Sequence, residues 1–308
     1  MTLPTRFTST KEVVQVVSSG SSCAILVEGE GQDGDAWILH QITKRTASQA
    51  VTFYGRGSRL DVLAQLPAFV SSLPEGKVAA IIDRDFTEDK IVEQTFSSDY
   101  PGHLFYWRRS CIENYLLEPK WITEFVEVLP GQISEELRTP EAVEEFLLDW
   151  SKRLAPQVAG NWVISDLTSI SEEQRLMVTA RQYFQELDDR DPDPAWVLDQ
   201  TTRNYGGWSK AVPELFSPES LRSRFEGRLA QVRGKVQILT DAHQIVSSKL
   251  LLKALHQKLP KNFKPGTKYI RNRLAQMASK QMPDDIRILI EERILPRWHR
   301  ARAAQSST

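Results

Sequence analysis

The stretch ILVEG at residues 25–29 is an apolar run that ends in a carboxylate, Glu28, and a glycine. A second apolar run, VAAII at residues 78–82, ends in a similar way and is followed by Asp83 and Asp85. Short apolar runs bounded by turn residues predict buried strands. Because the carboxyl ends of parallel strands share the edge at which open α/β folds bind ligands, we expect these three acids to converge.

The converging acids predict a metal site. Residues i and i+2 of an extended chain point the same way, so Asp83 and Asp85 should face one side together. Three carboxylates at one edge repel one another unless a hard divalent cation lies among them. Oxygen ligands suit Mg²⁺, with Mn²⁺ as the alternative. The pattern therefore predicts a centre for phosphoryl transfer.

Strand-like and helical segments alternate over residues 1 to about 120, which predicts βαβ units and a mainly parallel sheet in an α/β fold. Beyond residue 121 strands become scarce and helical spacing dominates. One short apolar run, 236–239, is compatible with a strand that returns to the sheet edge. We expect three regions: a metal-binding core (1–124), an acidic helical insertion that offers a docking or dimer surface (125–220), and a basic helical region that completes the core (221–308).

The net charge of −1 conceals an asymmetry. Residues 221–308 carry 19 Lys and Arg against 6 Asp and Glu, a net of +13, and residues 1–220 carry the balancing −14. The split indicates a nucleic-acid footprint in the C-terminal third. The alternative is that basic helices neutralise the acidic region by packing on it. The candidate nucleic-acid contacts are Lys261, Lys264, Lys268, Arg271 and Arg273.

Composition narrows the class of protein further. A composition of 41% hydrophobic and 26% charged residues is typical of a globular protein, and we expect a cytoplasmic protein without a membrane segment. Cys23 and Cys111 show no paired spacing with the five histidines, which argues against a zinc motif. The chain contains no Gly-x-x-x-x-Gly-Lys-Ser/Thr motif, so nucleotide hydrolysis of the P-loop kind is not expected.

The Glu-Gly and Asp-x-Asp strand ends resemble the TOPRIM domain over roughly residues 20–120. The sharper resemblance is to the OLD-like TOPRIM nucleases of bacterial phage defence, the group that includes the effector of the PARIS system. It rests on VEGEGQDGDAWIL at 27–39, IIDRDF at 81–86 and RRSCIENYLLEP at 108–119. The stretch IVSSKLLLKAL at 245–255 resembles the family's Gly-Lys helix start, with Ser248 where a glycine is usual.

The chain departs from the family at the first motif. The family commonly has Glu-Gly-x-x-Asp, but here Gln32 follows four residues after Glu28. Asp33 and Asp35 are the available substitutes, and a longer glycine-rich turn would bring Asp35 to the start of the next helix. Glu113 has two interpretations, a site residue or the last residue of a Ser-x-x-Glu capping box.

The resemblance implies a mechanism. Asp83, Asp85 and Asp35 would hold Mg²⁺, with Glu113 as a further candidate ligand, while Glu28 joins the metal shell or accepts the proton of the attacking water. Lys249, at the Gly-Lys position, would neutralise charge that develops on the scissile phosphate.

Residues 55–58, GRGS, stand between a strand-like run and a helix, where their amides either hold a phosphate or form a plain turn, the latter being favoured.

The resemblance also implies a biological setting. PARIS-like effectors are held inactive on an ATPase partner and, once released, dimerise and cleave tRNA, which stops growth of the infected cell. We therefore expect a magnesium-dependent endoribonuclease that acts as a toxin-like antiviral effector. Two alternatives remain open: an OLD-like DNA nuclease, and a non-catalytic subunit of an ATPase complex whose altered Glu-Gly motif no longer binds metal.

Overall fold

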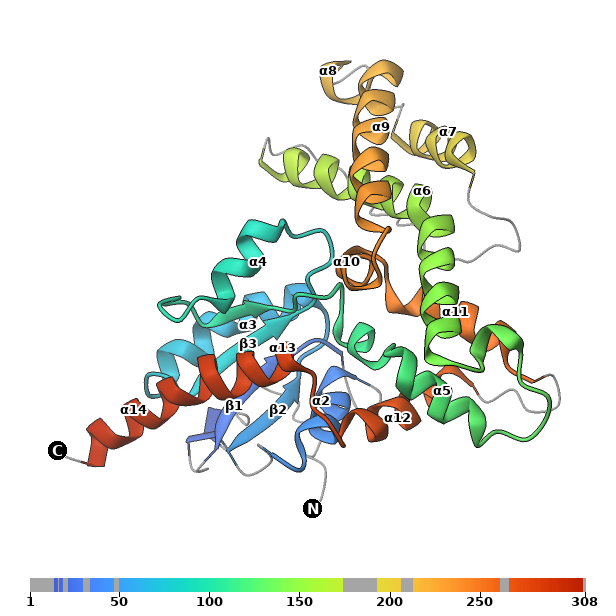
Figure 1. Ribbon diagram of the computed structural model, residues 1–308. Coiled ribbons are helices and arrows are strands. Elements are labelled where there is room, and N and C mark those ends of the chain that lie inside the picture. Colours follow the sequence, from blue (N-terminus) through green and yellow to red (C-terminus); the bar gives the residue numbers. More distant parts are fainter. Residues whose placement is uncertain are drawn as a thin grey trace. The chain divides into compact units, whose positions relative to one another are not determined.

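The computed structural model describes residues 14–15, 17–18, 22–29, 34–46, 50–173, 193–205, 213–260 and 266–306. The chain divides into two compact units, one formed by residues 1–121 with 265–308 and the other by residues 122–264 (Figure 1). The first boundary is close to the expected one at residue 124. The expected basic region 221–308 is divided between the units, since its last 44 residues belong with the N-terminal one.

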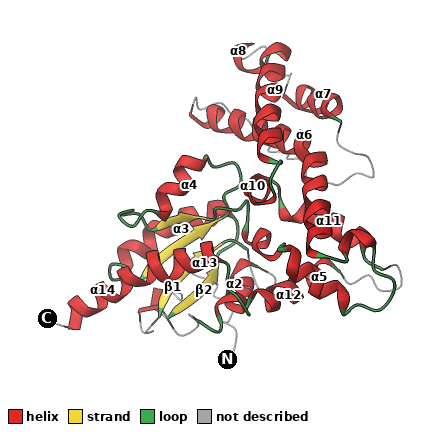
Figure 2. Ribbon diagram, viewed as in Figure 1, coloured by secondary structure: helices red, strands yellow, loops and turns green. Residues whose placement is uncertain are grey.

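The first unit is built on a four-stranded sheet in which every pair of neighbouring strands is parallel (Figure 2). The strands are β1 (Cys23–Val27), β2 (Val51–Gly55), β3 (Val78–Ile82) and β4 (Leu104–Tyr106), in the order β2-β1-β3-β4. All five residues of both central strands, β1 and β3, are buried. This pattern explains why they read as unbroken apolar runs, and it confirms the expected parallel α/β architecture.

Helices connect the strands and follow the last one. They are α2 (Asp35–Thr43), α3 (Arg59–Ser72), α4 (Asp89–Phe96) and the 3₁₀ helix η2 (Ile112–Leu116). The C-terminal segment adds α12 (Thr267–Ala278), α13 (Asp284–Arg287), the π-helix η5 (Ile288–Ile294) and α14 (Leu295–Ser306).

The C-terminal helices pack into the first unit at Gly76 and Lys77. A Cβ on Gly76 would lie 2.9 Å from the carbonyl oxygen of Arg297, so only glycine permits this approach of α14. The Lys77 ammonium lies 4.6 Å from the ring centre of Trp298, which is itself buried. Residues 265–308 therefore complete the core of the sheet-bearing unit.

The second unit is helical in the residues that the structure describes. Its elements are α5 (Pro119–Glu127), which begins before the boundary, η3 (Glu135–Leu137), α6 (Pro140–Glu173), α7 (Pro194–Tyr205), α8 (Pro213–Phe216), α9 (Pro218–Lys235), α10 (Leu239–Ile245) and α11 (Ser248–Lys258). The Arg228 guanidinium on α9 donates two hydrogen bonds, at 2.7 and 2.8 Å, to the Asp166 carboxylate on α6.

The strand suggested at 236–239 is wrong. Residues 236–238 form the turn between α9 and α10, and Leu239 begins α10; Val236 and Leu239 are buried, while Ile238 is 59% exposed. An apolar run in a helix connection can bury its side chains between helices without any strand partner, which is why periodicity alone misread it.

Candidate functional site

The strand ends bring Glu28 and Asp83 into direct contact. Glu28 follows β1 and Asp83 follows β3, and these strands are neighbours in the sheet. Oε1 of Glu28 accepts a hydrogen bond from the backbone N–H of Asp83 at 3.0 Å. The convergence expected from the two apolar runs is therefore present for this pair.

The charges of three more acids act on the Asp83 carboxyl. Burial, and after it the charges of Asp35, Glu28, Asp85 and Glu113, raise the pKa of the Asp83 carboxyl well above its usual range. Like charges act on a pKa in this way only when they stand close together in a poorly solvated place. The acids expected to form a metal site therefore lie near enough to Asp83 to disfavour its charged form.

One oxygen of Asp83 has no hydrogen-bond partner. Oδ1 is buried without a donor, although the side chain as a whole is partly exposed. A buried acceptor without a partner is costly, and native structures usually satisfy such an atom with protein, water or an ion. A carboxylate set of this kind fits a hard divalent cation, which would offset both the missing donor and the mutual repulsion.

The turn after Glu28 is held by two glycines. Gly29 adopts φ +77° and exchanges backbone hydrogen bonds with Gly57, at 2.7 and 3.2 Å. A Cβ on Gly29 would lie 2.9 Å from the Cα of Gly34. The turn that presents Glu28 therefore requires glycine.

The same contacts decide between the interpretations of residues 55–58. The N–H of Arg56 donates to the Val27 carbonyl at 2.9 Å, and the N–H of Ser58 donates to the Asp61 carboxylate at 2.8 Å. Together with the Gly57 amide, these groups already have acceptors within the protein. The segment is a structural turn that ties β2 to the Glu28 turn.

Asp85 departs from the expected extended geometry. Its φ is +46°, in the left-handed region, so the alternation of residues i and i+2 does not apply to Asp83 and Asp85. The N–H of Asp85 donates to the Ser110 carbonyl at 3.2 Å. The intervening Arg84 is buried, forms an ion pair with Asp89 and donates to the Arg108 carbonyl at 3.0 Å. The turn thus buries its arginine and leaves Asp85 exposed.

Glu113 lies within η2 and caps nothing. The residue before this helix is Cys111, and no side chain forms a capping hydrogen bond there, so the capping-box interpretation with Ser110 is wrong. The Glu113 carboxylate is buried and pairs with the Arg271 guanidinium at 3.4 Å. Its role as a metal ligand remains a prediction.

Asp35 opens α2, as the longer glycine-rich turn predicts. Gly34 precedes the helix in an extended conformation, and Asp35 is its first residue and is buried. Leu39 is fully buried, whereas Trp37 remains partly exposed. Gln32 and Asp33 lie outside the described residues.

The remaining candidates are spread along the chain. Lys249 stands exposed in the first turn of α11, in the second unit, and its catalytic role remains a prediction. Lys268 is exposed at the start of α12, and Arg273 donates to Gln276 at 2.9 Å. Lys261 and Lys264 lie outside the described residues.

Sequence reasoning missed Arg59. This first residue of α3 places its Nη1 3.7 Å from Oδ2 of Asp85. The helix start is fixed by a capping box between Ser58 and Asp61. The sequence signal that could have found Arg59 is this Ser-x-x-Asp box, which places an arginine at a helix start directly after a strand of the sheet.

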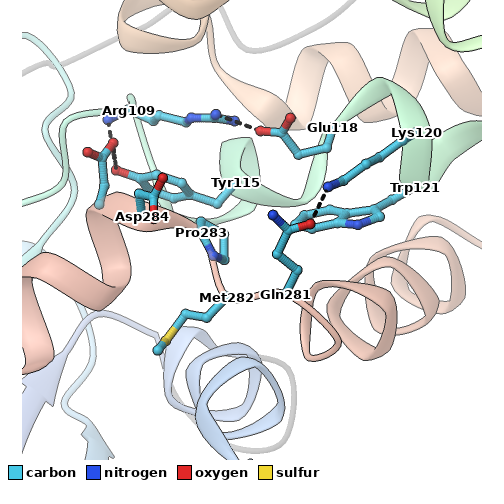
Figure 3. Close-up of a pocket in the computed structure, with 10 residues that line it drawn as sticks. Arg109, Tyr115, Glu118, Lys120, Trp121, Gln281, Met282, Pro283 and Asp284 are labelled. Atoms are coloured by element: carbon cyan, nitrogen blue, oxygen red, sulfur yellow. Dashed lines mark hydrogen bonds and ion pairs between the residues drawn. The ribbon is translucent and has the colours of Figure 1, made fainter. Parts of the chain in front are cut away.

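A cavity of about 250 Å³ in the first unit does not involve the five acids. Two of its charged side chains have partners in the lining: Arg109 forms an ion pair with Glu118 at 2.6 Å, and Lys120 donates to the side-chain oxygen of Gln281 at 2.6 Å (Figure 3). Among the described residues, no three Asp, Glu, His or Cys side chains already stand as a formed metal-binding group. The acids therefore have the composition of a metal site, and cation binding would have to draw their oxygens together.

No protein-family model matches the chain, and no curated protein matches it in sequence. Within the described part of the chain, no helix combines the length and the apolar composition that crossing a bilayer requires.

Proposed function

We propose that the chain is a divalent-metal-dependent nuclease whose sheet-bearing unit is a TOPRIM domain. The observation that carries this proposal is the position of Asp83, whose buried oxygen lacks a donor while four further acids raise the pKa of its carboxyl. Such an arrangement is unfavourable in a purely structural role. It becomes favourable when a cation is bound among the acids.

The acids have distinct roles in this proposal. Asp83, Asp85 and Asp35 hold Mg²⁺, with Mn²⁺ as a substitute, and Glu113 is the further candidate ligand. When bound, the ion polarises a phosphoryl oxygen and lowers the pKa of a water molecule. Glu28 is oriented by the Asp83 amide, which donates to its Oε1, so its carboxylate is positioned to join the ligands or to accept a proton.

The substrate and the setting follow from the resemblance to OLD-like defence nucleases. We propose cleavage of tRNA in preference to DNA, by a toxin-like antiviral effector that an ATPase partner restrains and that acts as a homodimer after release. The basic C-terminal residues support a polyanionic substrate, since Lys268 stands exposed at the start of α12.

The test compares purified wild-type protein with Glu28→Gln, incubated with Mg²⁺ or Mn²⁺ against bulk tRNA and supercoiled plasmid. Glu88→Gln is the matched control, because Glu88 is an exposed acid outside the cluster. We expect tRNA cleavage by wild-type and by the control, and loss of at least about a hundredfold in Glu28→Gln. Plasmid cleavage alone would favour the DNA nuclease. Absence of both cleavage and Mn²⁺ binding would reject the proposal.

A further inference from the structure

The first turn of α3 places one arginine against the acid cluster from the side of β2. The capping box fixes this turn, because Ser58 accepts from the Asp61 amide while the Asp61 carboxylate accepts from the Ser58 amide. Upstream, the Gly29–Gly57 backbone pair joins the same turn to the turn that carries Glu28. The backbone of Arg59 is therefore set relative to the acids.

The side chain of Arg59 is supported but not enclosed. Its guanidinium lies 5.6 Å from the ring centre of Tyr106, and Nη2 lies 3.4 Å from Oγ1 of Thr87. Nη1 reaches Asp85 only at 3.7 Å, which is longer than a hydrogen bond. A long contact between two partly exposed groups contributes little and is readily exchanged.

The other arginines near the acids are more deeply enclosed. The side chain of Arg84 is 3% exposed and that of Arg271 is 17% exposed, against 32% for Arg59. Arg84 is engaged by Asp89 and by the Arg108 carbonyl, and Arg271 neutralises the buried Glu113. Of these three, Arg59 is the cation that an incoming ligand can reach.

We infer that Arg59 contacts the phosphate group that is cleaved at this site and holds it against the carboxylates. The inference rests on the proposed function, and it names a substrate-binding residue that the metal-binding acids do not include. A guanidinium offers a planar pair of donors that match two phosphate oxygens. When Asp85 turns to a cation, its long contact with Arg59 is replaced by contact with the substrate.

The test uses full-length Arg59→Gln and Arg59→Lys, with Arg56→Gln as the matched control. Arg56 lies three residues earlier, has the same charge and donates to Gln65 at 2.7 Å, so its loss imposes the same change in net charge. Binding of fluorescently labelled tRNA is measured by anisotropy in Ca²⁺ over a series of KCl concentrations. Mn²⁺ binding is measured in parallel by calorimetry.

We expect Arg59→Gln to weaken tRNA binding about tenfold and to reduce the slope of log K against log salt by about one. Arg59→Lys should recover the slope but only part of the affinity, since an ammonium lacks the planar pair of donors. Mn²⁺ binding should remain at the wild-type level. Arg56→Gln should have a smaller effect on both tRNA measurements.

The inference would be overturned if Arg59→Gln and Arg56→Gln weakened tRNA binding equally, or if neither change weakened it. It would also be overturned if the wild-type protein did not bind tRNA. The inference and the proposed function fail separately. Cleavage that depends on Glu28 but not on Arg59 rejects the inference alone. Binding that depends on Arg59, without cleavage or Mn²⁺ binding by wild-type protein, rejects the nuclease and keeps the phosphate contact.

Discussion

Asp83 shows how a carboxylate crowded by other acids opposes stability. Its pKa is raised in the folded protein, so the folded chain holds this proton more tightly than the unfolded chain does. In the linkage relation, the free energy of unfolding then falls as the pH rises above the unfolded value of about 4 and through the raised folded value. A bound cation removes this dependence because it stabilises the ionised form.

Asp83→Asn should therefore stabilise the metal-free protein while it weakens Mn²⁺ binding. We expect the free energy of unfolding at pH 8 to rise by about 1 kcal/mol, because the amide removes a buried charge that its neighbours repel. Urea denaturation between pH 5 and pH 8 should also give a flatter profile for the variant. Asp61→Asn is the control, and it should lower the free energy of unfolding, since hydrogen bonds from Ser58 lower the pKa of the Asp61 carboxyl. A destabilised Asp83→Asn would contradict this account.

Asp85 carries a charge and has a left-handed backbone conformation, and two substitutions can separate the effects of these features on stability and on metal binding. Asp85→Gly relieves the backbone and removes the carboxylate, so we expect unchanged or higher stability with reduced Mn²⁺ affinity. Asp85→Ala removes the same carboxylate but retains a Cβ, which should cost about 1 kcal/mol relative to glycine. Thermal unfolding and Mn²⁺ titration distinguish these effects. Equal stability of the two variants would show that the φ of +46° carries no strain.

Among the elements, the strands were the most predictable. β1 and β3 are buried over their whole length, and a fully buried strand must be apolar at every position. The helix starts at Arg59 and Pro218 are also set locally, because the Ser58 and Ser217 side chains cap them. Local sequence determines such features, so one sequence is enough to find them.

The misread features depend on tertiary contacts. The run 236–239 is apolar because Val236 and Leu239 are buried beside a helix turn. Glu113 carries the spacing of a capping box, but its carboxylate contacts Arg271, 158 residues away. The capping box places Arg59 at a helix start, but its relation to Asp85 arises only when β2 and β3 join the same sheet.

The connection between β4 and η2 is held by Arg108. Its guanidinium donates to both oxygens of Glu93, at 2.9 and 2.7 Å, and to Asp285 at 2.9 Å. It also lies 3.9 Å from the ring centre of Phe96. One side chain therefore ties this connection, which supplies the Ser110 carbonyl to Asp85, to α4 and α13.

Arg108→Ala should accordingly affect both stability and the site. We expect a loss of about 2 kcal/mol in the free energy of unfolding, since three carboxylate contacts and the aromatic packing disappear together. Mn²⁺ affinity should also fall because the segment that holds Asp85 is released. The control is Arg138→Ala, which removes an exposed pair with Glu135 and should cost less than about 0.5 kcal/mol. Equal melting temperatures for the two variants would argue against this role of Arg108 in holding the connection between β4 and η2.

At the scale of the whole molecule, the charge asymmetry has two uses. Part of the C-terminal positive charge serves packing within the first unit: Arg271 pairs with Glu113, while Arg293 and Arg297 donate to the carbonyls of Phe96 and Gly102. Other basic residues, such as Lys268, stay exposed and suit a polyanion. Neutralisation by packing and nucleic-acid binding are therefore not exclusive alternatives.

The division of the chain predicts that its C-terminal helices cannot be removed as a separate nucleic-acid-binding tail. A chain that ends at Pro260 loses α12 to α14, and with them the buried side chains of Leu274, Ile290 and Trp298. We expect the sheet-bearing unit to lose cooperative unfolding and to bind a dye that reports exposed apolar surface, because a large part of its core is missing.

The control ends at Arg300, which keeps Trp298 against Lys77 and should melt within a few degrees of the full chain. Near-ultraviolet circular dichroism and Mn²⁺ titration of both chains make the comparison. If the chain ending at Pro260 kept a cooperative transition and bound Mn²⁺ normally, residues 265–308 would be a dispensable appendage. Loss of both would mean that the acids hold their positions only while the last helices cover the sheet.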